Sequence, residues 1–202
     1  MLFRTLRPAL SLLILLTLLT GLAYPLLITA VAQVAFPVAA NGSAIADKTA
    51  VTGSALIGQA FAEPGHFWGR PSATTPQPYN GLASGGSNLG PNNPALLDAI
   101  RVRAATLRAA DPAQQAPIPV DLVTASASGL DPDISPAAAR WQIGRVARVR
   151  QISPAALTAL IEQHIVPRFW GLLGEPHVNV LALNLDLDQR FPVAGTPAPA
   201  VR

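Results

Sequence analysis

Residues 9–31 read ALSLLILLTLLTGLAYPLLITAV and contain no charged side chain. A helix rises about 1.5 Å per residue, so about 20 apolar residues cross the roughly 30 Å hydrocarbon layer of a membrane. A single helix satisfies its own backbone hydrogen bonds and is therefore stable in lipid. The sequence predicts a transmembrane helix over residues 9–31, followed by one water-soluble domain.

Positive charge flanks only the N-terminal end of this stretch. Arg4 and Arg7 precede it, and the next basic residue is Lys48. Because Lys and Arg stay on the cytoplasmic side, residues 1–8 are predicted to be cytoplasmic and the domain periplasmic, in a bacterial inner membrane. The predicted parts after the helix are a neck, the domain and a flexible tail, over residues 32–50, 51–191 and 192–202.

A cleaved signal peptide is the alternative for this N-terminal segment. MLFRTLR would be its basic region, and Ala30-Val31-Ala32 its cleavage site. The apolar region of a signal peptide normally has about 7–15 residues, and this run is longer. Its length favours a retained anchor.

Composition excludes several kinds of functional site. The chain has 202 residues and no Cys, which excludes disulfides, thiolate metal sites and a cysteine nucleophile. Its formal net charge is +3, of which Arg4 and Arg7 contribute two, and no basic run of the kind that binds nucleic acid is present. About 170 residues follow the helix, enough for one domain with its own core.

Helix-start signals predict at least three helices in this domain. Asn93-Pro94, Ser135-Pro136 and Ser153-Pro154 are N-cap and N1 pairs. The first helix is expected to end at Asp111-Pro112, and the second is expected to run over Ala137–Ile152.

Two stretches predict a small sheet. Val51–Phe61 is typical of a strand or strand pair with glycine breaks. Val178–Asp188 alternates leucine with polar or small residues, which predicts a half-buried strand. The fold class expected is therefore α+β.

A long Gly/Pro-rich loop is expected over Ala62–Asn93. Loops of this length are either functional or disordered, and Phe67, Trp68 and Tyr79 favour an ordered loop. With the segment Asp121–Pro136, it is expected to face a partner.

Catalytic motifs are weak or absent in this sequence. It contains no GxxxxGK[ST], no HExxH and no GxSxG. His66 with Asp131 and Asp133 is a weak candidate for a metal site, because a zinc site needs three or four ligands that converge. His66 is instead expected to be an ordinary loop side chain. A hydrolase triad would have to be drawn from four scattered residues, namely Ser84, Ser87, His164 and Asp131. His164 is instead expected at the surface of the third helix, near Glu162.

Two further groups are candidates for contact with a ligand or partner. Ser84-Gly85-Gly86-Ser87-Asn88 forms either an anion-binding nest of backbone amides or a glycine turn that needs positive φ, and the turn is preferred. Four arginines of the second helix are expected to form a solvated face, which could dock an acidic partner together with Arg70. They are Arg140, Arg145, Arg148 and Arg150.

Several segments, in the same order, resemble the C subunit of the Kdp-type potassium-transporting P-type ATPase. They are Thr20-Gly21-Leu22-Ala23-Tyr24-Pro25-Leu26, Gly53-Ser54-Ala55-Leu56-Ile57-Gly58-Gln59, Phe67-Trp68-Gly69-Arg70-Pro71-Ser72-Ala73, Tyr79-Asn80, residues 83–91 (ASGGSNLGP), residues 121–132 (DLVTASASGLDP), Ile134-Ser135-Pro136, Gly174-Glu175-Pro176 and Val178-Asn179-Val180-Leu181. One position departs from the pattern, because Asp133 stands where the family usually has His.

The resemblance implies an accessory subunit, itself no enzyme, of a high-affinity, ATP-driven potassium importer. Its implied partners are a channel-like potassium-binding subunit, the ATP-hydrolysing P-type subunit and a small single-span subunit. The family subunit is described as a catalytic chaperone that raises the pump's ATP affinity, so Arg70, residues 84–88, Asp131 and Asp133 become candidates for nucleotide or partner contact. The resemblance implies no covalently bound cofactor. Any contact with ATP would be made through the ATP-hydrolysing partner subunit.

The predicted orientation argues against direct nucleotide binding, since ATP is scarce outside the cell. We therefore expect an assembly and stabilising role, with Thr20, Gly21 and Ala23 permitting close helix packing in the membrane. Four acidic residues are also expected to bias cation entry, namely Asp131, Asp133, Asp186 and Asp188. A direct nucleotide-binding regulator and a membrane-anchored periplasmic hydrolase remain the alternatives.

Overall fold

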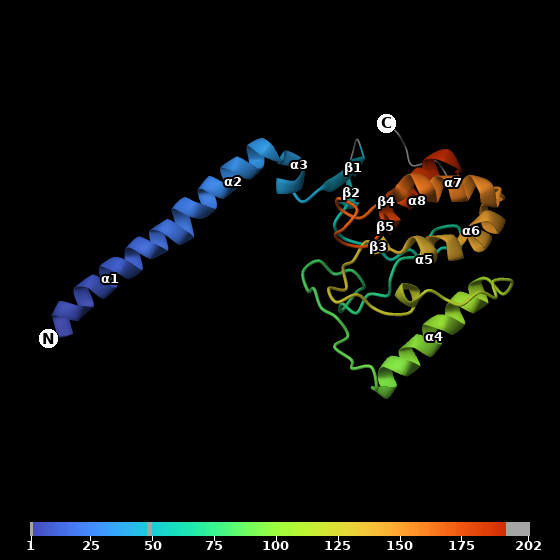
Figure 1. The fold of residues 1–202 in the computed structure, drawn as a ribbon, viewed down its shortest axis with the longest axis horizontal. Helices are drawn as coiled ribbons and strands as arrows, with labels where there is room; N and C mark the ends of the chain where they lie inside the picture. Colours follow the sequence, from blue (N-terminus) through green and yellow to red (C-terminus); the bar gives the residue numbers. More distant parts are fainter. Residues whose placement is uncertain (1, 48–49, 193–202) are drawn as a thin grey trace. The chain divides into compact units, whose positions relative to one another are not determined.

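A computed structural model describes residues 2–47 and 50–192. The chain divides into two compact units, Met1–Ala44 and Ile45–Arg202. The predicted tail from residue 193 onward and Lys48 lie outside the described residues. Figure 1 shows the elements in chain order.

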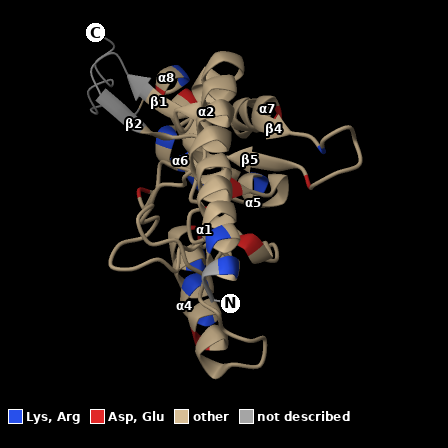
Figure 2. Ribbon diagram, turned by 90° about the vertical axis from the view of Figure 1, so that its left-hand side faces the viewer, with Lys and Arg blue, Asp and Glu red and all other residues tan. Residues whose placement is uncertain are grey.

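The first unit is a long helix followed by a short one. It consists of α1 (Leu2–Leu18), the π-helical turn η1 (Leu19–Ala23), α2 (Tyr24–Ala35) and α3 (Pro37–Ala40). Arg4–Ala35 is long and apolar enough to cross a membrane, and none of its most apolar window is buried. The helix therefore begins before and ends after the predicted span, residues 9–31. Figure 2 shows basic residues near its N-terminus and no charge along the rest of it.

The π-helical turn has a local cause in the sequence. Pro25 has no backbone N–H and cannot donate to the carbonyl of Gly21. The N–H of Tyr24 donates to Leu19 O, five residues back, which widens the turn. The hydroxyl of Thr20 donates to Leu16 O at 2.7 Å, so this polar group is satisfied within the helix.

The second unit combines short strands with five helices among its described residues. Its first elements are β1 (Ala44–Asp47), β2 (Ala50–Ser54), α4 (Pro94–Ala110) and the 3₁₀ turn η2 (Val120–Leu122). Then come β3 (Asp133–Ile134), α5 (Pro136–Trp141), α6 (Ile143–Arg150), α7 (Pro154–His164), β4 (Ile165–Val166), β5 (His177–Asn179) and α8 (Val180–Arg190). The α+β class is confirmed.

The strands form two small sheets. β1 pairs with β2, and β3, β5 and β4 form an antiparallel sheet in that order. Val178 of β5 lies opposite Ile134 on one side and Ile165 on the other. The predicted strand over Val51–Phe61 is confirmed only as far as Ser54.

The three predicted helix starts are confirmed. The side chains of Asn93, Ser135 and Ser153 accept hydrogen bonds from backbone N–H groups two or three residues ahead. The second helix is not continuous, however, because it breaks at Gln142 between α5 and α6. Gln142 is fully buried, and its side chain bonds another segment of the chain.

The predicted strand over Val178–Asp188 is wrong beyond Asn179. Asn179 ends β5 and caps α8, accepting a hydrogen bond from Ala182 N at 3.0 Å. The helix buries Val180, Leu183 and Leu187 at helical spacing, with the polar Asn184 on the same stripe. That buried asparagine hides the helical period, so only the alternation of leucines is visible in the sequence.

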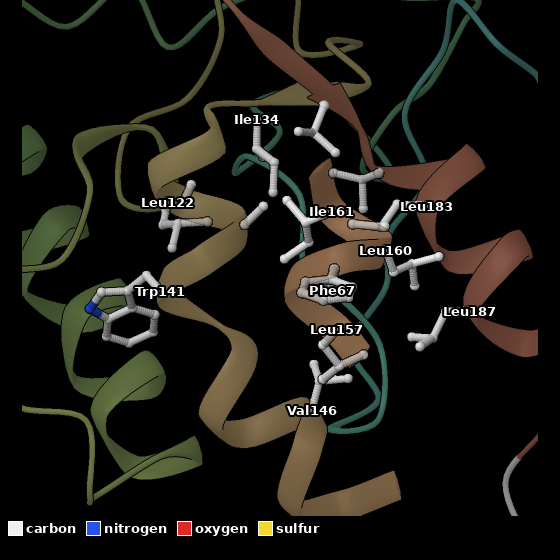
Figure 3. Packing of buried hydrophobic residues seen from close by; sticks show 14 of the residues in the cluster. Phe67, Leu122, Ile134, Trp141, Val146, Leu157, Leu160, Ile161, Leu183 and Leu187 are labelled. Atoms are coloured by element: carbon white, nitrogen blue, oxygen red, sulfur yellow. The ribbon is translucent and has the colours of Figure 1, made fainter. Parts of the chain in front are cut away.

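The core lies between α5, α6, α7, α8 and the three-stranded sheet. Figure 3 shows Phe67 close to Leu157 and Ile161 of α7, with Leu183 and Leu187 of α8 beside them. Phe67 is 0% exposed although it belongs to the long loop, so this loop contributes to the core.

Candidate functional site

The start of the long loop is held on the domain through its backbone. Asn184 accepts from Phe67 N at 2.8 Å and donates to Phe67 O at 2.9 Å. Gln142 makes the same pair of bonds with Trp68, at 2.8 and 3.0 Å. The expectation of an ordered loop over residues 62–93 is confirmed here, and buried amides from two helices provide the order.

Arg145 holds the same loop and corrects the expected arginine face. Its guanidinium donates to Pro64 O at 2.5 Å and His66 O at 2.9 Å, and it stacks 4.2 Å from the Trp68 ring centre. Burial lowers its pKa to about 10, so it is still charged at neutral pH.

Arg150 is buried too, bonding Gly65 O and Asp188. Arg140 and Arg148 remain exposed, and they pair with Glu162 and Asp111. The prediction of a solvated face is therefore wrong for Arg145 and Arg150. The four arginines do not gather with Arg70, which bonds the segment Asp121–Pro136 instead. The sequence does not reveal these two buried arginines, because their acceptors are backbone carbonyls of a loop about 80 residues away.

The loop over residues 62–93 and the segment Asp121–Pro136 dock on one another, and we call them the docked loops. Gly85 N donates to Ser128 O at 2.8 Å, and the Ser84 hydroxyl donates to the same oxygen at 3.0 Å. The Ser72 hydroxyl donates to Gly129 O at 2.7 Å. The two segments expected to face a partner thus form one surface.

Glycines make this docking possible. Gly129 has φ +68°, and a Cβ there would lie 2.6 Å from Gly85 O. A Cβ on Gly86 would lie 2.7 Å from Ala127 O. Close backbone approach therefore explains Gly86 and Gly129.

The expected glycine turn with positive φ is not formed by Gly85 and Gly86. Asn88 is the residue of the SGGSN stretch that has positive φ, at 52°. An anion-binding nest needs free amides, and the Gly85 amide is already bonded to Ser128 O. Ser84, Ser87 and Asn88 are exposed.

An ion pair lies at the junction of the docked loops. Arg70 Nη1 donates to Asp131 Oδ2 at 2.9 Å, and Nη2 donates to Ala125 O at 3.3 Å. Within the described part of the chain, the buried Arg70 Nε has no hydrogen-bond partner. Arg70 and Asp131 both line two open grooves, of ≈ 490 and ≈ 550 Å³. Asp121, Asp133 and His177 line the first, and Ser126 and Ser128 line the second.

Burial shifts two ionisable groups at this junction. It raises the pKa of Tyr79 to about 12, with a contribution from Asp131, and the phenol donates to Arg70 O at 2.5 Å. Burial also raises the pKa of Asp133, against the opposing effect of His177, which lies 3.9 Å away. Asp131 accepts from Asp133 N at 3.0 Å, so these two candidates lie together.

The candidate metal and hydrolase sites are not assembled. His66 contacts the carboxylate of Asp188 at 3.1 Å, and not Asp131 or Asp133, with which it was considered as a metal site. Among the described residues, no group of three or more His, Asp or Glu side chains is placed to hold a metal ion. His164 pairs with Asp186 at 2.8 Å rather than lying free near Glu162. Ser84 bonds Ser128 O and Asp131 bonds Arg70, so no triad forms.

The four acidic residues expected to act on cations fall into two groups. Asp186 is bonded by His164 and Arg190, and Asp188 by Arg150 and His66. The negative charges of Asp186 and Asp188 are therefore largely balanced by these neighbouring side chains. Asp131 and Asp133 remain at the junction of the docked loops.

Comparison with known proteins decides the family. The family model described as "K+-transporting ATPase, c chain", KdpC, matches residues 6–189. The chain belongs to the KdpC family. A KdpC subunit of the potassium-transporting ATPase from Variovorax paradoxus is 63% identical over 182 residues, covering 90% of this chain and 94% of that protein.

Two further relatives carry the same name. The KdpC subunit from Sorangium cellulosum is 62% identical over 183 residues, covering 91% of this chain and 96% of its own. That from Dechloromonas aromatica is 58% identical over 183 residues, with the same two shares. The KdpC match includes both the N-terminal helix and the docked loops, and it confirms the resemblance of the sequence segments.

Proposed function

We propose that this chain is a non-catalytic accessory subunit that stabilises an ATP-driven potassium importer. The observation that carries the proposal is family membership along residues 6–189, joined to an apolar helix whose most apolar window is not buried by any of the described residues. Such a helix needs lipid or other helices around it. A channel-like potassium-binding subunit, the ATP-hydrolysing subunit and a small single-span subunit are the proposed partners.

The charge distribution supports one orientation in the membrane. Arg4 and Arg7 lie in the first turns of α1, and they are the basic residues nearest the apolar run over residues 9–31. Positive residues next to a span are retained in the cytoplasm. The proposal therefore places the N-terminus inside and the domain in the periplasm.

The docked loops are the proposed partner surface in that compartment. The Gly85 amide is used within the domain and Gly86 packs against Ala127, which leaves little of the nest that nucleotide phosphates would need. Any effect on the pump's ATP affinity would then pass through protein contacts. Arg70 and Asp131 contribute a partly exposed ion pair to this surface.

Replacing Gly21 tests the assembly role. A Cβ at Gly21 would meet Thr17 Cγ2 only at 4.0 Å, so the helix itself tolerates Gly21→Leu. Loss of close packing should reduce co-purification of this chain with the tagged ATP-hydrolysing subunit. Leu22→Ile, which keeps the side-chain volume next to Gly21, is the control and should co-purify normally. Unchanged co-purification of Gly21→Leu would contradict the packing role of Thr20, Gly21 and Ala23.

A further inference from the structure

A second exposed feature lies outside the docked loops. The loop between β4 and β5 carries Phe169–Leu173, FWGLL, which we call the apolar tip. Its large side chains are 62%, 82%, 80% and 61% exposed at Phe169, Trp170, Leu172 and Leu173. None of the four belongs to the core cluster or packs against it. The rings of Phe169 and Trp170 stack on one another, with centres 4.8 Å apart.

Several backbone groups of the apolar tip bond one another. Phe169 N donates to Leu173 O at 2.8 Å, Leu173 N to Phe169 O at 3.0 Å, and Leu172 N to Phe169 O at 3.1 Å. Trp170 and Gly171 both have positive φ, at 52° and 75°, so the chain reverses within two residues. These internal bonds lower the cost of moving the backbone of the turn out of water.

A polar rim limits the apolar tip. Arg168 and Glu175 form an ion pair at 2.6 Å at its base. Figure 2 shows this loop projecting away from the helices of the second unit, with one basic and one acidic position at its base and no charge beyond them. The loop thus has an apolar end, two aromatic residues and a charged base. Side chains at a membrane interface change from apolar to charged in the same order.

We propose that the apolar tip inserts into the interface of the same bilayer that holds the N-terminal helix. The inference rests on the membrane anchoring proposed above. Between Ala35, where α2 ends, and Ile45, where the second unit begins, the chain can extend no more than about 35 Å. The domain is thus tethered near lipid, which makes a second, weak insertion effectively intramolecular.

The exposed indole of the tip also suits an interfacial position. Trp170 is 82% exposed, which leaves its indole N–H open to headgroup oxygens. Insertion would give the domain a second point of attachment and fix its orientation over the membrane.

Single-cysteine probes test the proposal directly, since the chain has no cysteine of its own. Leu172→Cys, Leu82→Cys and Ile14→Cys are each labelled with a nitrobenzoxadiazole fluorophore in the full chain. Leu82, 99% exposed on another loop, is the matched control, and Ile14 reports on the span. Each protein is placed alone in nanodiscs of phosphatidylethanolamine and phosphatidylglycerol, with or without nitroxide lipids.

The expected result is a blue-shifted fluorophore at position 172 that loses most of its emission to nitroxide lipids and resists aqueous iodide. Position 82 should show the reverse, and position 14 should be quenched by lipid. Quenching at 14 with a water-like signal at 172 overturns the insertion but leaves the anchoring intact. A signal at 172 that becomes shielded only when the partner subunits are added means docking on protein, which also overturns it. No lipid quenching at 14 overturns the anchoring and the insertion together.

Discussion

Arg145→Met is the substitution that tests most strictly how the long loop is held. Arg145 is 1% exposed and donates to Pro64 O, His66 O and the Gln142 side chain, the last at 2.6 Å. Methionine keeps much of the length and apolar packing of arginine but removes every donor. Three acceptors inside the domain are then left without this partner.

The structure gives the size of the effect. A hydrogen bond to a charged group contributes about 1.5–3 kcal/mol, and the stacking on Trp68 contributes up to about 2 kcal/mol. Burying the guanidinium costs several kcal/mol and offsets much of that sum. We expect a net loss of about 3 kcal/mol in the free energy of unfolding, which for a chain of this size lowers Tm by roughly 6–12 °C.

Urea unfolding of the full chain in detergent, followed by tryptophan fluorescence, measures this loss. Arg140→Met is the matched control, because Arg140 pairs with Glu162 at the surface and should change stability by less than about 1 kcal/mol. Limited chymotrypsin digestion adds a local readout, since a released loop exposes the bond after Trp68. Equal midpoints for the two variants, with the bond after Trp68 equally protected, would refute the idea that Arg145 fixes the loop.

Three other substitutions test the docked loops and α8. Gly129→Ala should lose about 3 kcal/mol in urea unfolding, because of its positive φ and the close approach of Gly85 O; a loss below about 1 kcal/mol would mean that the loops separate easily. Asn184→Leu should lose a similar amount, since it leaves the buried N–H and C=O of Phe67 unbonded, and wild-type stability would contradict this. Burial raises the pKa of Asp133 above its usual 3.8, so the wild type loses stability as pH rises through that raised pKa. Asp133→Asn should therefore gain stability relative to wild type between pH 4 and pH 7, and a gap that narrows over this range would be evidence against burial as the cause.

The parts of the fold that could be predicted from the sequence are those set by local rules. The charge-free run over residues 9–31 and the cap pairs at Asn93, Ser135 and Ser153 each act within a few residues. They gave the membrane helix candidate and the starts of α4, α5 and α7. The α8 helix was mistaken for a strand because its buried stripe includes Asn184, whose partner, Phe67, lies 117 residues away.

The sequence predicts the two candidate segments as separate partner-facing stretches, but it does not predict the bonds between them. The glycine-rich loop and the segment Asp121–Pro136 were both expected to face a partner, and the structure joins them. The pairing of Arg70 with Asp131 depends on docking across 61 residues, which no local pattern encodes. For the same reason Arg145 was assigned to the surface, since its acceptors are backbone carbonyls of a distant loop.

The most direct test of the proposed function is to determine on which side of the membrane the domain lies. Leu82→Cys, at a fully exposed position of the long loop, is the only thiol in its variant and is treated with a membrane-impermeant maleimide. The account predicts labelling in intact spheroplasts and none in inside-out vesicles, with Leu2→Cys as a control that shows the opposite pattern and keeps both Arg4 and Arg7. Labelling of Leu82→Cys only in inside-out vesicles would place the domain beside the ATP supply and contradict the account, as would a protein released free of the membrane.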